Sequence, residues 1–389
     1  MFDMLVVGGG LIGCATAWHL ARAGASVLLV EAGDINAGAS GRNAGSLHFQ
    51  IERRFIENGD AMAAQAAQIV ALNRMAVDDW RGLEAEVGED LHVVMHGGLM
   101  VAETAAEVAL LAAKVAREQA YGLDTRLVDG DAARRIAPYL SPGILAACHS
   151  PDEGHADPRT ITPALARAAK AAGAVLRTGA RVVSIERRHG IFEVGVDRAG
   201  VVTQVQCHRL LLATGAFTPQ VARLANVHVP LFPVALQMNV TARVAPFLPH
   251  LIQHVGRRLS MKQAHSGNVL IGGGWPSRLG ATPTVRPGLS HASLRGNLRA
   301  AVDVVPSVAD LDLIRTWTAV TTISADQLPI AGEVPAMPGM FVAAGGSAFT
   351  LGPTFARLVA EAMLGRADQH LKIVSPGRFD HLNSFMGTA

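Results

Sequence analysis

Cysteine is scarce in this chain of 389 residues: only Cys14, Cys148 and Cys207 occur, far apart in sequence. There is no C-x-x-C pair and no cysteine–histidine spacing of the kind that holds zinc or an iron–sulfur cluster, so we expect no metal site. Isolated thiols that form no disulfide framework are typical of a reducing compartment. The sequence therefore predicts reduced, mostly buried cysteines.

Long uncharged apolar runs are also missing, since none reaches the roughly 18 residues that a membrane span needs. Met1 is followed almost at once by a strand-like segment, Met4–Val7, which leaves no room for the charged start of a secretory signal. We expect a cytoplasmic protein, with peripheral contact at the inner face of a membrane left open. An excess of basic residues is absent too: 34 Lys and Arg stand against 32 Asp and Glu, so no nucleic-acid partner is expected.

Hydrophobic residues make up 50% of the chain, and its length exceeds what one core usually fills, so two domains are expected. The order of strand and helix patterns predicts an α/β protein (α+β overall). Segments of nucleotide-binding character occur at the start, middle and end, which indicates a Rossmann-like domain interleaved with an antiparallel-sheet domain. A long helix is expected over Ala61–Val87, and a functional loop of small residues over Ala32–Ser46.

The first 31 residues carry the most specific pattern. Gly8, Gly10 and Gly13 form G-x-G-x-x-G between a buried strand and a helix. The first glycine permits the tight turn, the second lets a pyrophosphate approach the backbone, and the third lets helix and strand pack closely. Glu31 ends the next strand, where a carboxylate accepts hydrogen bonds from ribose hydroxyls and disfavours a 2′-phosphate. The unit predicts dinucleotide binding but leaves FAD and NAD open.

From Gly8 to Glu31 the sequence reads G-x-G-x-x-G-x-x-x-A-x-x-L-x-x-x-G-x-x-V-x-x-x-E, which resembles the amino-terminal signature of the D-amino-acid oxidase, glycine oxidase and sarcosine oxidase superfamily. Residues 210–215, 317–332 and 344–353 fit later segments of the same family. The resemblance implies FAD as cofactor and two interleaved domains. It also implies a helix beneath the flavin, for which Gly352 suits the N-cap and Pro353 the first position. The FAD-binding domain would comprise residues 1–90, 151–225 and 325–389, and the substrate-binding domain residues 91–150 and 226–324. The implied FAD contacts outside the glycine motif and the small-residue loop are Leu11, Ile12, Ala32, Val182, Ala213, Thr214, Gly215, Gly345, Gly346, Phe349, Thr350 and Leu351.

The loop around residues 39–50 is more selective. Its small residues permit close approach to a planar ring, and Ser40, Arg42 and Asn43 supply donors for phosphate or ribityl oxygens. Together with these three, the expected FAD contacts here are Gly41, Ala44, Gly45, Ser46 and Leu47. The loop resembles the β subunits of bacterial D-hydroxyproline, octopine and nopaline dehydrogenases. That resemblance implies partner subunits that accept electrons on FMN, FAD or an iron–sulfur cluster, and it leaves open a second flavin at an interface.

One segment departs from the family. Where the amino-acid oxidases have an Arg-Pro pair whose arginine clamps the substrate carboxylate, this chain has Thr321 and Thr322. Arg315, Lys262 and His265 are the candidates for replacing the clamp. His48 follows the flavin loop and could orient the substrate or help to deprotonate its amine. The candidate catalytic residues are therefore His48, Lys262 and Thr321.

The sequence favours FAD-dependent oxidation of a D-configured or secondary amino acid, such as D-hydroxyproline or an opine, by hydride transfer from Cα–H to flavin N5 in the β subunit of a multi-subunit dehydrogenase. A self-sufficient oxidase that makes hydrogen peroxide is the first alternative. A non-catalytic flavin-carrying subunit for assembly and electron relay is the second. An NAD-dependent dehydrogenase is disfavoured, because the carboxy-terminal glycine-rich segment would have no role in one.

Overall fold

The computed structural model describes residues 1–280, 287–366 and 368–386. Within this part of the chain, one eight-stranded sheet is built around parallel strands in the order β18–β11–β1–β2–β8. At one edge β17 is antiparallel to β18, and the β9–β10 hairpin extends the first half of β11. The strands are β1 (Phe2–Val7), β2 (Val27–Val30), β8 (Val175–Arg177), β9 (Arg181–Arg188), β10 (Ile191–Arg198), β11 (Val201–Leu212), β17 (Ile330–Glu333) and β18 (Met340–Ala344).

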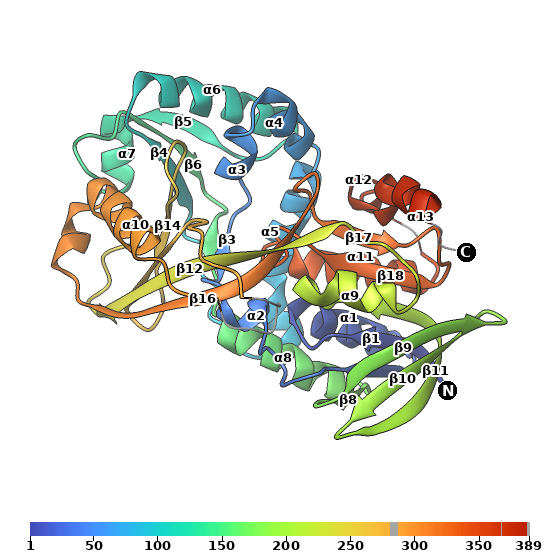
Figure 1. Cartoon of the computed structure of the whole chain (residues 1–389). Helices are drawn as coiled ribbons and strands as arrows, with labels where there is room; N and C mark the ends of the chain where they lie inside the picture. Colours follow the sequence, from blue (N-terminus) through green and yellow to red (C-terminus); the bar gives the residue numbers. More distant parts are fainter. Residues whose placement is uncertain (281–286, 367, 387–389) are drawn as a thin grey trace.

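Helices cover one face of this first sheet (Figure 1). They are α1 (Leu11–Arg22), α5 (Val70–Val87), α8 (Pro158–Ala171) and α11 (Gly352–Met363). Strands β2 and β18 and the last four residues of β1 are continuous runs of buried, mostly aliphatic residues, as expected where both faces of a parallel sheet are covered. Helix α8 begins where the sequence places a cap: the Asp157 carboxylate accepts the Arg159 N–H at 2.8 Å, and Pro158 occupies the first turn.

A second sheet, also of eight strands in the described residues, has the order β16–β12–β15–β14–β13–β4–β6–β5. Its strands are β4 (Gly98–Ala102), β5 (Arg126–Asp129), β6 (Ala146–Ser150), β12 (Leu231–Arg243), β13 (Leu251–His254), β14 (Ser260–Gln263), β15 (Asn268–Gly272) and β16 (Leu313–Ser324). Every neighbouring pair is antiparallel except β4–β13, which is parallel and joins two distant parts of the chain. The expected antiparallel sheet is thus present with one parallel pair.

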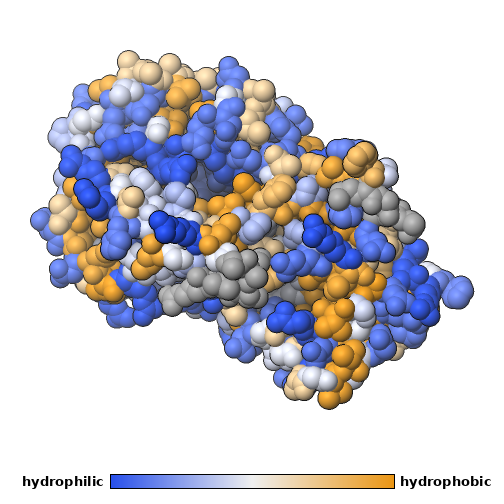
Figure 2. All heavy atoms as spheres, in the orientation of Figure 1, coloured by the Kyte–Doolittle hydropathy of each residue, from blue (hydrophilic) through white to orange (hydrophobic). Residues whose placement is uncertain are grey.

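Helices α6 (Ala105–Ala120), α7 (Gly130–Ile136) and α10 (His291–Val304) pack on the second sheet and close its cores. Both chain ends lie on the side of the first sheet (Figure 1). The space-filling view shows apolar atoms gathered at the lower right, over the β9–β11 region, where Val183, Val201 and Val202 are exposed (Figure 2). The remaining elements are α2 (Ala39–Arg42), β3 (Ser46–Leu47), α3 (Arg53–Ile56), α4 (Asp60–Ala67), β7 (Gly154–His155), η1 (Gly215–Phe217), α9 (Thr218–Arg223), η2 (Pro306–Asp310), α12 (Leu371–Val374), η3 (Pro376–Phe379) and α13 (Asp380–Met386).

Three local predictions need correction. The helix expected over Ala61–Val87 is two helices, α4 and α5, because the chain tightens at Gln68 and Ile69, whose N–H groups bond to carbonyls three residues back. The loop expected over Ala32–Ser46 contains the short helix α2. Gly352 is the first residue of α11 and not its N-cap, which is Leu351.

The strands of the first sheet come from residues 2–30, 175–212 and 330–344, and those of the second from residues 98–150 and 231–324. The exact domain boundaries given above stay a prediction. Within the described ranges, no helix is both long enough and apolar enough to cross a bilayer.

Candidate active site

A cleft of about 1470 Å³ separates the carboxyl ends of the parallel strands from the second sheet. From the first sheet it is lined by residues 7–10, 30–33, 37–44, 180–182 and 213–217, and from the other side by Val240, Lys262, Leu270 and residues 315–318. Ligands bind at this edge in open α/β sheets, outside the ends of the strands. The cleft exceeds the volume of an ordinary small-molecule pocket, so it has room for a dinucleotide and a substrate together.

The glycine motif has the geometry that close backbone approach requires. Gly8 has φ +113°, and a Cβ there would lie 2.5 Å from the Ala213 carbonyl oxygen. A Cβ on Gly13 would lie 2.0 Å from the Gly8 oxygen, so α1 could not pack against the turn. Gly10 is the N-cap of α1 and offers no side chain to the first-turn N–H groups, although the Leu11 N–H donates to the Ser40 hydroxyl at 3.0 Å. The helix start is thus open to an anionic ligand.

Glu31 sits at the end of β2 and lines the cleft. Its two carboxylate oxygens accept the N–H groups of Gly9 and Gly33, both at 2.7 Å. These bonds fix the carboxylate beside the glycine turn. It can then accept ribose hydroxyls, as the sequence predicts, and its charge opposes a 2′-phosphate.

At the other end of the cleft, the small-residue loop brings β3 against the second sheet. Asn43 holds the turn through its side-chain oxygen, which accepts the Gly45 N–H at 2.6 Å. A Cβ on Gly45 would lie 2.1 Å from the Ala156 oxygen and 3.0 Å from the Lys262 Nζ, so only glycine permits this approach. Lys262 is 2% exposed and donates to the Ala156 oxygen at 3.3 Å. Burial lowers the pKa of Lys262 to about 7, although the charge of Asp157 opposes the shift.

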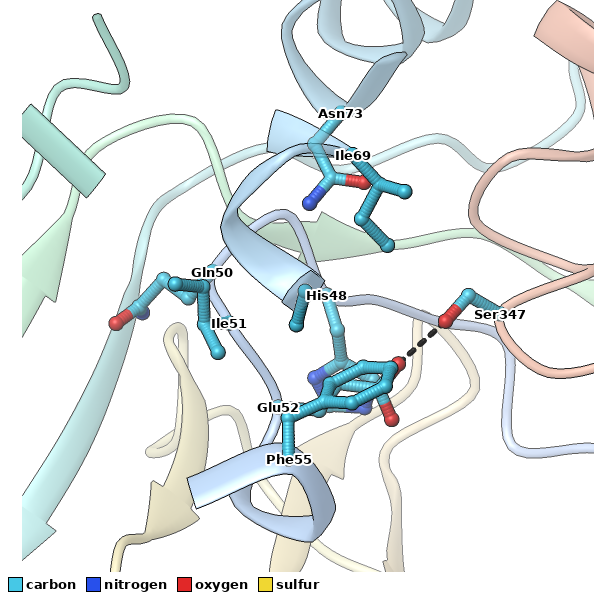
Figure 3. Close-up of a pocket in the computed structure, with 9 residues that line it drawn as sticks. His48, Gln50, Ile51, Glu52, Phe55, Ile69, Asn73 and Ser347 are labelled. Carbon is cyan, nitrogen blue, oxygen red and sulfur yellow. Dashed lines mark hydrogen bonds between the residues drawn. The ribbon is translucent and has the colours of Figure 1, made fainter. Parts of the chain in front are cut away.

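His48 lies beside Ser260, two residues before Lys262 on β14, and its Nε2 is 3.2 Å from the Ser260 hydroxyl. Its Nδ1 is buried without a hydrogen-bond partner among the described residues. Burial lowers the pKa of His48, so the imidazole is neutral at physiological pH. The ring borders a small cavity that Glu52, Asn73 and Ser347 also line (Figure 3).

Glu52 supplies a carboxylate to the lining of that small cavity. Burial alone would raise the pKa of Glu52, but the charge and hydrogen bond of Arg54, together with His48 and the Ser347 hydroxyl, outweigh burial and lower the value to about 2. Ser347 donates its hydroxyl to the same carboxylate (Figure 3). Ser347 precedes α11, so this contact ties the last glycine-rich turn to the segment that carries His48.

Many predicted contacts line the large cleft, including every candidate for the missing carboxylate clamp. Arg315 is exposed, and His265 stacks on His92 with 3.7 Å between ring centroids. Among the predicted residues, those that line the cleft are Gly8, Gly10, Glu31, Ala32, Ser40, Gly41, Arg42, Asn43, Ala44, Val182, Ala213, Thr214, Gly215, Lys262, His265 and Arg315.

Other predicted residues lie behind or beside the cleft wall. Thr321 faces Val234 across the β12–β16 pair, and the Thr322 hydroxyl donates to the Phe232 oxygen at 3.1 Å, so the Thr pair serves the sheet in this structure. The role of Thr321 stays a prediction. The others outside the lining are Leu11, Ile12, Gly13, Gly45, Ser46, Leu47, His48, Gly345, Gly346, Phe349, Thr350 and Leu351.

Sequence reasoning missed the segment His155–Arg159, which lines the cleft and is hydrogen-bonded to the small-residue loop. Asp157 and Pro158 begin helix α8, and such a capping motif carries no signal for a ligand. Ser260 was missed as well, because its contact with His48 joins residues that are 212 positions apart.

The first sheet carries a glycine-rich turn, a helix start without a side-chain cap from its own N-cap residue, and a glutamate at the end of β2. It faces a second sheet across a deep cleft. These features define a dinucleotide-binding oxidoreductase. The chain belongs to the DAO family of FAD dependent oxidoreductases, whose model matches residues 3–362. The residues fit FAD, because Gly10 leaves the start of α1 without a side-chain cap of its own at the cleft, and Glu31 lines the cleft beside it. FAD is therefore its cofactor.

The chain is similar to the B subunit of the opine oxidase of Rhizobium meliloti, with 26% identity over 97% of this chain and 98% of that one. It is 30% identical to 4-methylaminobutanoate oxidase (formaldehyde-forming) of Paenarthrobacter nicotinovorans over 88% of this chain and 41% of that protein. Among solved structures, L-proline dehydrogenase from P. horikoshii superposes with a TM-score of 0.84 at 22% identity, covering 98% of both chains. That structural likeness supports the fold.

Proposed function

We propose that this chain oxidises a D-configured or secondary amino acid, of the D-hydroxyproline or opine type, as the FAD-carrying β subunit of a multi-subunit dehydrogenase. The observation that carries the proposal is the single cleft in which the dinucleotide cradle continues into a pocket lined by Lys262, His265 and Arg315. The likeness to the opine oxidase polypeptide of Rhizobium meliloti, over nearly the full length of both chains, supports the substrate class and the subunit role.

The protein's own groups prepare the substrate amine. Bound FAD would accept a hydride from the substrate Cα–H at its N5 atom. That step needs a neutral amine, whereas amino acids carry an ammonium group in water. Lys262, with its pKa near 7, and the neutral His48 can take up that proton at the edge of the cleft. Both lie on the β14 side of the site, where the buried surroundings exclude water.

The residue that binds the substrate carboxylate differs from the one in the amino-acid oxidases that the sequence resembles. Thr321 and Thr322 cannot supply a charge, and Thr322 is bonded within the sheet. Arg315 lines the cleft from its position on β16 and makes no side-chain hydrogen bond or ion pair within the described ranges, so its guanidinium is available for a carboxylate. His265 lines the same wall and can add a second donor.

The proposed function and its main alternative differ in the electron acceptor. As a β subunit, the chain passes electrons to partner chains in the cytoplasm that carry FMN, FAD or an iron–sulfur cluster. A self-sufficient oxidase instead reduces O₂ to hydrogen peroxide. The 26% identity to glycine oxidase from Geobacillus kaustophilus over 92% of both chains makes this a specific alternative.

The test is anaerobic titration of the purified FAD-loaded chain with D-hydroxyproline, octopine, nopaline and sarcosine, with flavin absorbance followed at ~450 nm. One of the first three should bleach the flavin. Air is then admitted and peroxide is measured: slow reoxidation with little peroxide supports the dehydrogenase subunit, and peroxide at full turnover supports the oxidase. If no amine bleaches a fully loaded chain, the proposed substrate class is wrong.

A further inference from the structure

The segment that carries His48 has no regular secondary structure between β3 and α3, yet Phe49, Gln50 and Ile51 are buried. Its backbone groups are bonded to side chains from distant parts of the chain. His48 N–H donates to the Thr350 hydroxyl at 3.2 Å, and Ile51 N–H donates to Glu118 at 2.6 Å. Buried backbone groups need such partners, so these side chains determine where the segment lies.

Glu153 is the centre of this arrangement. It precedes β7, is fully buried, and accepts hydrogen bonds from four groups. Two are backbone N–H groups, those of Phe49 at 3.1 Å and Gln50 at 3.2 Å. Two are side-chain amides, those of Gln50 at 2.7 Å and Gln253 at 3.1 Å. Because all four partners are donors, these hydrogen bonds favour the carboxylate form of Glu153 over the protonated acid.

The charge of a buried cation, Lys114, stabilises this carboxylate. Lys114 on α6 donates to the Gln50 side-chain oxygen at 2.7 Å and pairs with Glu118, also at 2.7 Å. Burial raises the pKa of Glu153 to about 7, while the bonds from Gln50 and the charge of Lys114 pull it down. Figure 3 shows the Gln50 amide directed away from the small cavity that His48 borders, which leaves it free for these partners.

The same carboxylate reaches His48 by a second route. Gln253 on β13 donates to Glu153 and also interacts with the His48 imidazole, where it favours the protonated form. The other groups that act on the imidazole are Glu52, Lys262 and Arg54. Glu153 therefore holds both the backbone next to His48 and the amide beside its ring.

We propose that Glu153 is a positioning residue, which fixes residues 49 and 50 together with Gln253 and thereby holds the His48 imidazole against Ser260, on the same strand as the cleft residue Lys262. The proposal rests on the function proposed above, in which His48 acts on the substrate amine. It assigns to a buried acid outside the cleft the placement of a group that the reaction uses. Small displacements of such a group cost large factors in rate.

The test compares wild-type holoenzyme with Glu153→Gln, which keeps the size of the side chain and removes its charge. Hydrogen exchange of the peptide that covers residues 47–52 is measured first, without substrate. We expect exchange at least about tenfold faster in the variant, because two backbone N–H groups lose a charged acceptor. Flavin reduction by whichever of the four amines bleaches the wild type is measured next, as rate constant and substrate Kd across pH. The rate constant should fall on the order of 10- to 100-fold, with Kd nearly unchanged.

Asn297→Ser is the matched control, because Asn297 is equally buried on α10, where it is bonded to Asn239 and to the Gly272 oxygen and, in the described part of the chain, makes no hydrogen bond to residues 47–52. It should lower the melting temperature without changing exchange in the peptide or the rate constant. Glu153→Asp serves as a second variant, with a retained charge and an intermediate rate, and carries the test if Glu153→Gln does not fold.

Unchanged exchange of residues 47–52 in a folded Glu153 variant overturns the proposal, as does a rate–pH profile that coincides with that of the wild type. Failure of all four amines to bleach the wild-type flavin counts instead against the proposed function, and the exchange measurement still decides whether Glu153 places the segment.

Discussion

Replacing Lys114 by methionine should strongly destabilise the folded chain. Lys114 is 1% exposed, forms an ion pair with the fully buried Glu118, and acts through its charge on the fully buried Glu153. Methionine fills a similar volume but leaves both carboxylates without it. Removing one partner of a buried ion pair costs about 3–5 kcal/mol, most of which is the penalty of the charge left behind.

The pH dependence has a definite sign. The neighbouring anions raise the pKa of Lys114 above its ordinary value despite burial, so its contribution is fully present below pH 10.5 and is lost only as the pH rises through the folded-state pKa. In Lys114→Met the buried carboxylates can instead be neutralised by protonation. The loss of stability should therefore be larger at pH 8 than at pH 5.5.

Urea unfolding of the holoenzyme at both pH values measures these differences. The double variant Lys114→Met/Glu118→Gln, which restores the charge balance, should recover most of the loss. Lys170→Met, at an exposed position of α8, should change the stability by less than about 0.5 kcal/mol. A cost below about 1 kcal/mol for Lys114→Met, or a double variant no more stable than the single one, would refute the electrostatic reasoning.

Three further predictions concern the cleft. Glu31→Gln should weaken FAD binding about 10- to 100-fold, because charged hydrogen bonds of about 1.5–3 kcal/mol are lost. Fluorescence titration of the apoprotein with FAD measures the Kd. An unchanged Kd contradicts the ribose contact. Arg315→Ala should raise the substrate Kd about tenfold with little change in the rate of flavin reduction, whereas the exposed Arg299→Ala should change neither; equal effects would remove Arg315 as the carboxylate partner. The ratio of reduction rate to substrate Kd should rise with pH through about 7 as Lys262 loses its proton, and Lys262→Met should abolish that inflection in stopped-flow measurements. An inflection that persists in the variant would assign it to another group.

The part of the fold that the sequence predicts best is local. Gly8, Gly10, Gly13 and Glu31 lie within one βαβ unit, where spacing alone determines which residues meet. The break between α4 and α5 was not predictable, because residues 68 and 69 are glutamine and isoleucine, and neither residue type indicates a helix end as glycine or proline would. It depends on how the two helices pack.

The network behind His48 was equally hidden. Gln50, Lys114, Glu118, Glu153 and Gln253 come from separate places in the chain, and none belongs to a recognisable motif. In sequence, Glu153 looks like an ordinary acid in a turn between Pro151 and Gly154. Only the packing of α6 and β13 around it, together with the fold of the 48–51 segment, turns it into a buried anion with four donors.

The arrangement of the first sheet also affects synthesis on the ribosome. Strand β1 emerges well before its neighbour β11, which ends at Leu212, and before β18, which completes the parallel core and begins at Met340. Until most of the chain has been translated, the nascent amino-terminal unit therefore has an unpaired strand edge. We therefore expect FAD to bind only once β18 has been made, and a message truncated before β18 should yield colourless, aggregation-prone protein.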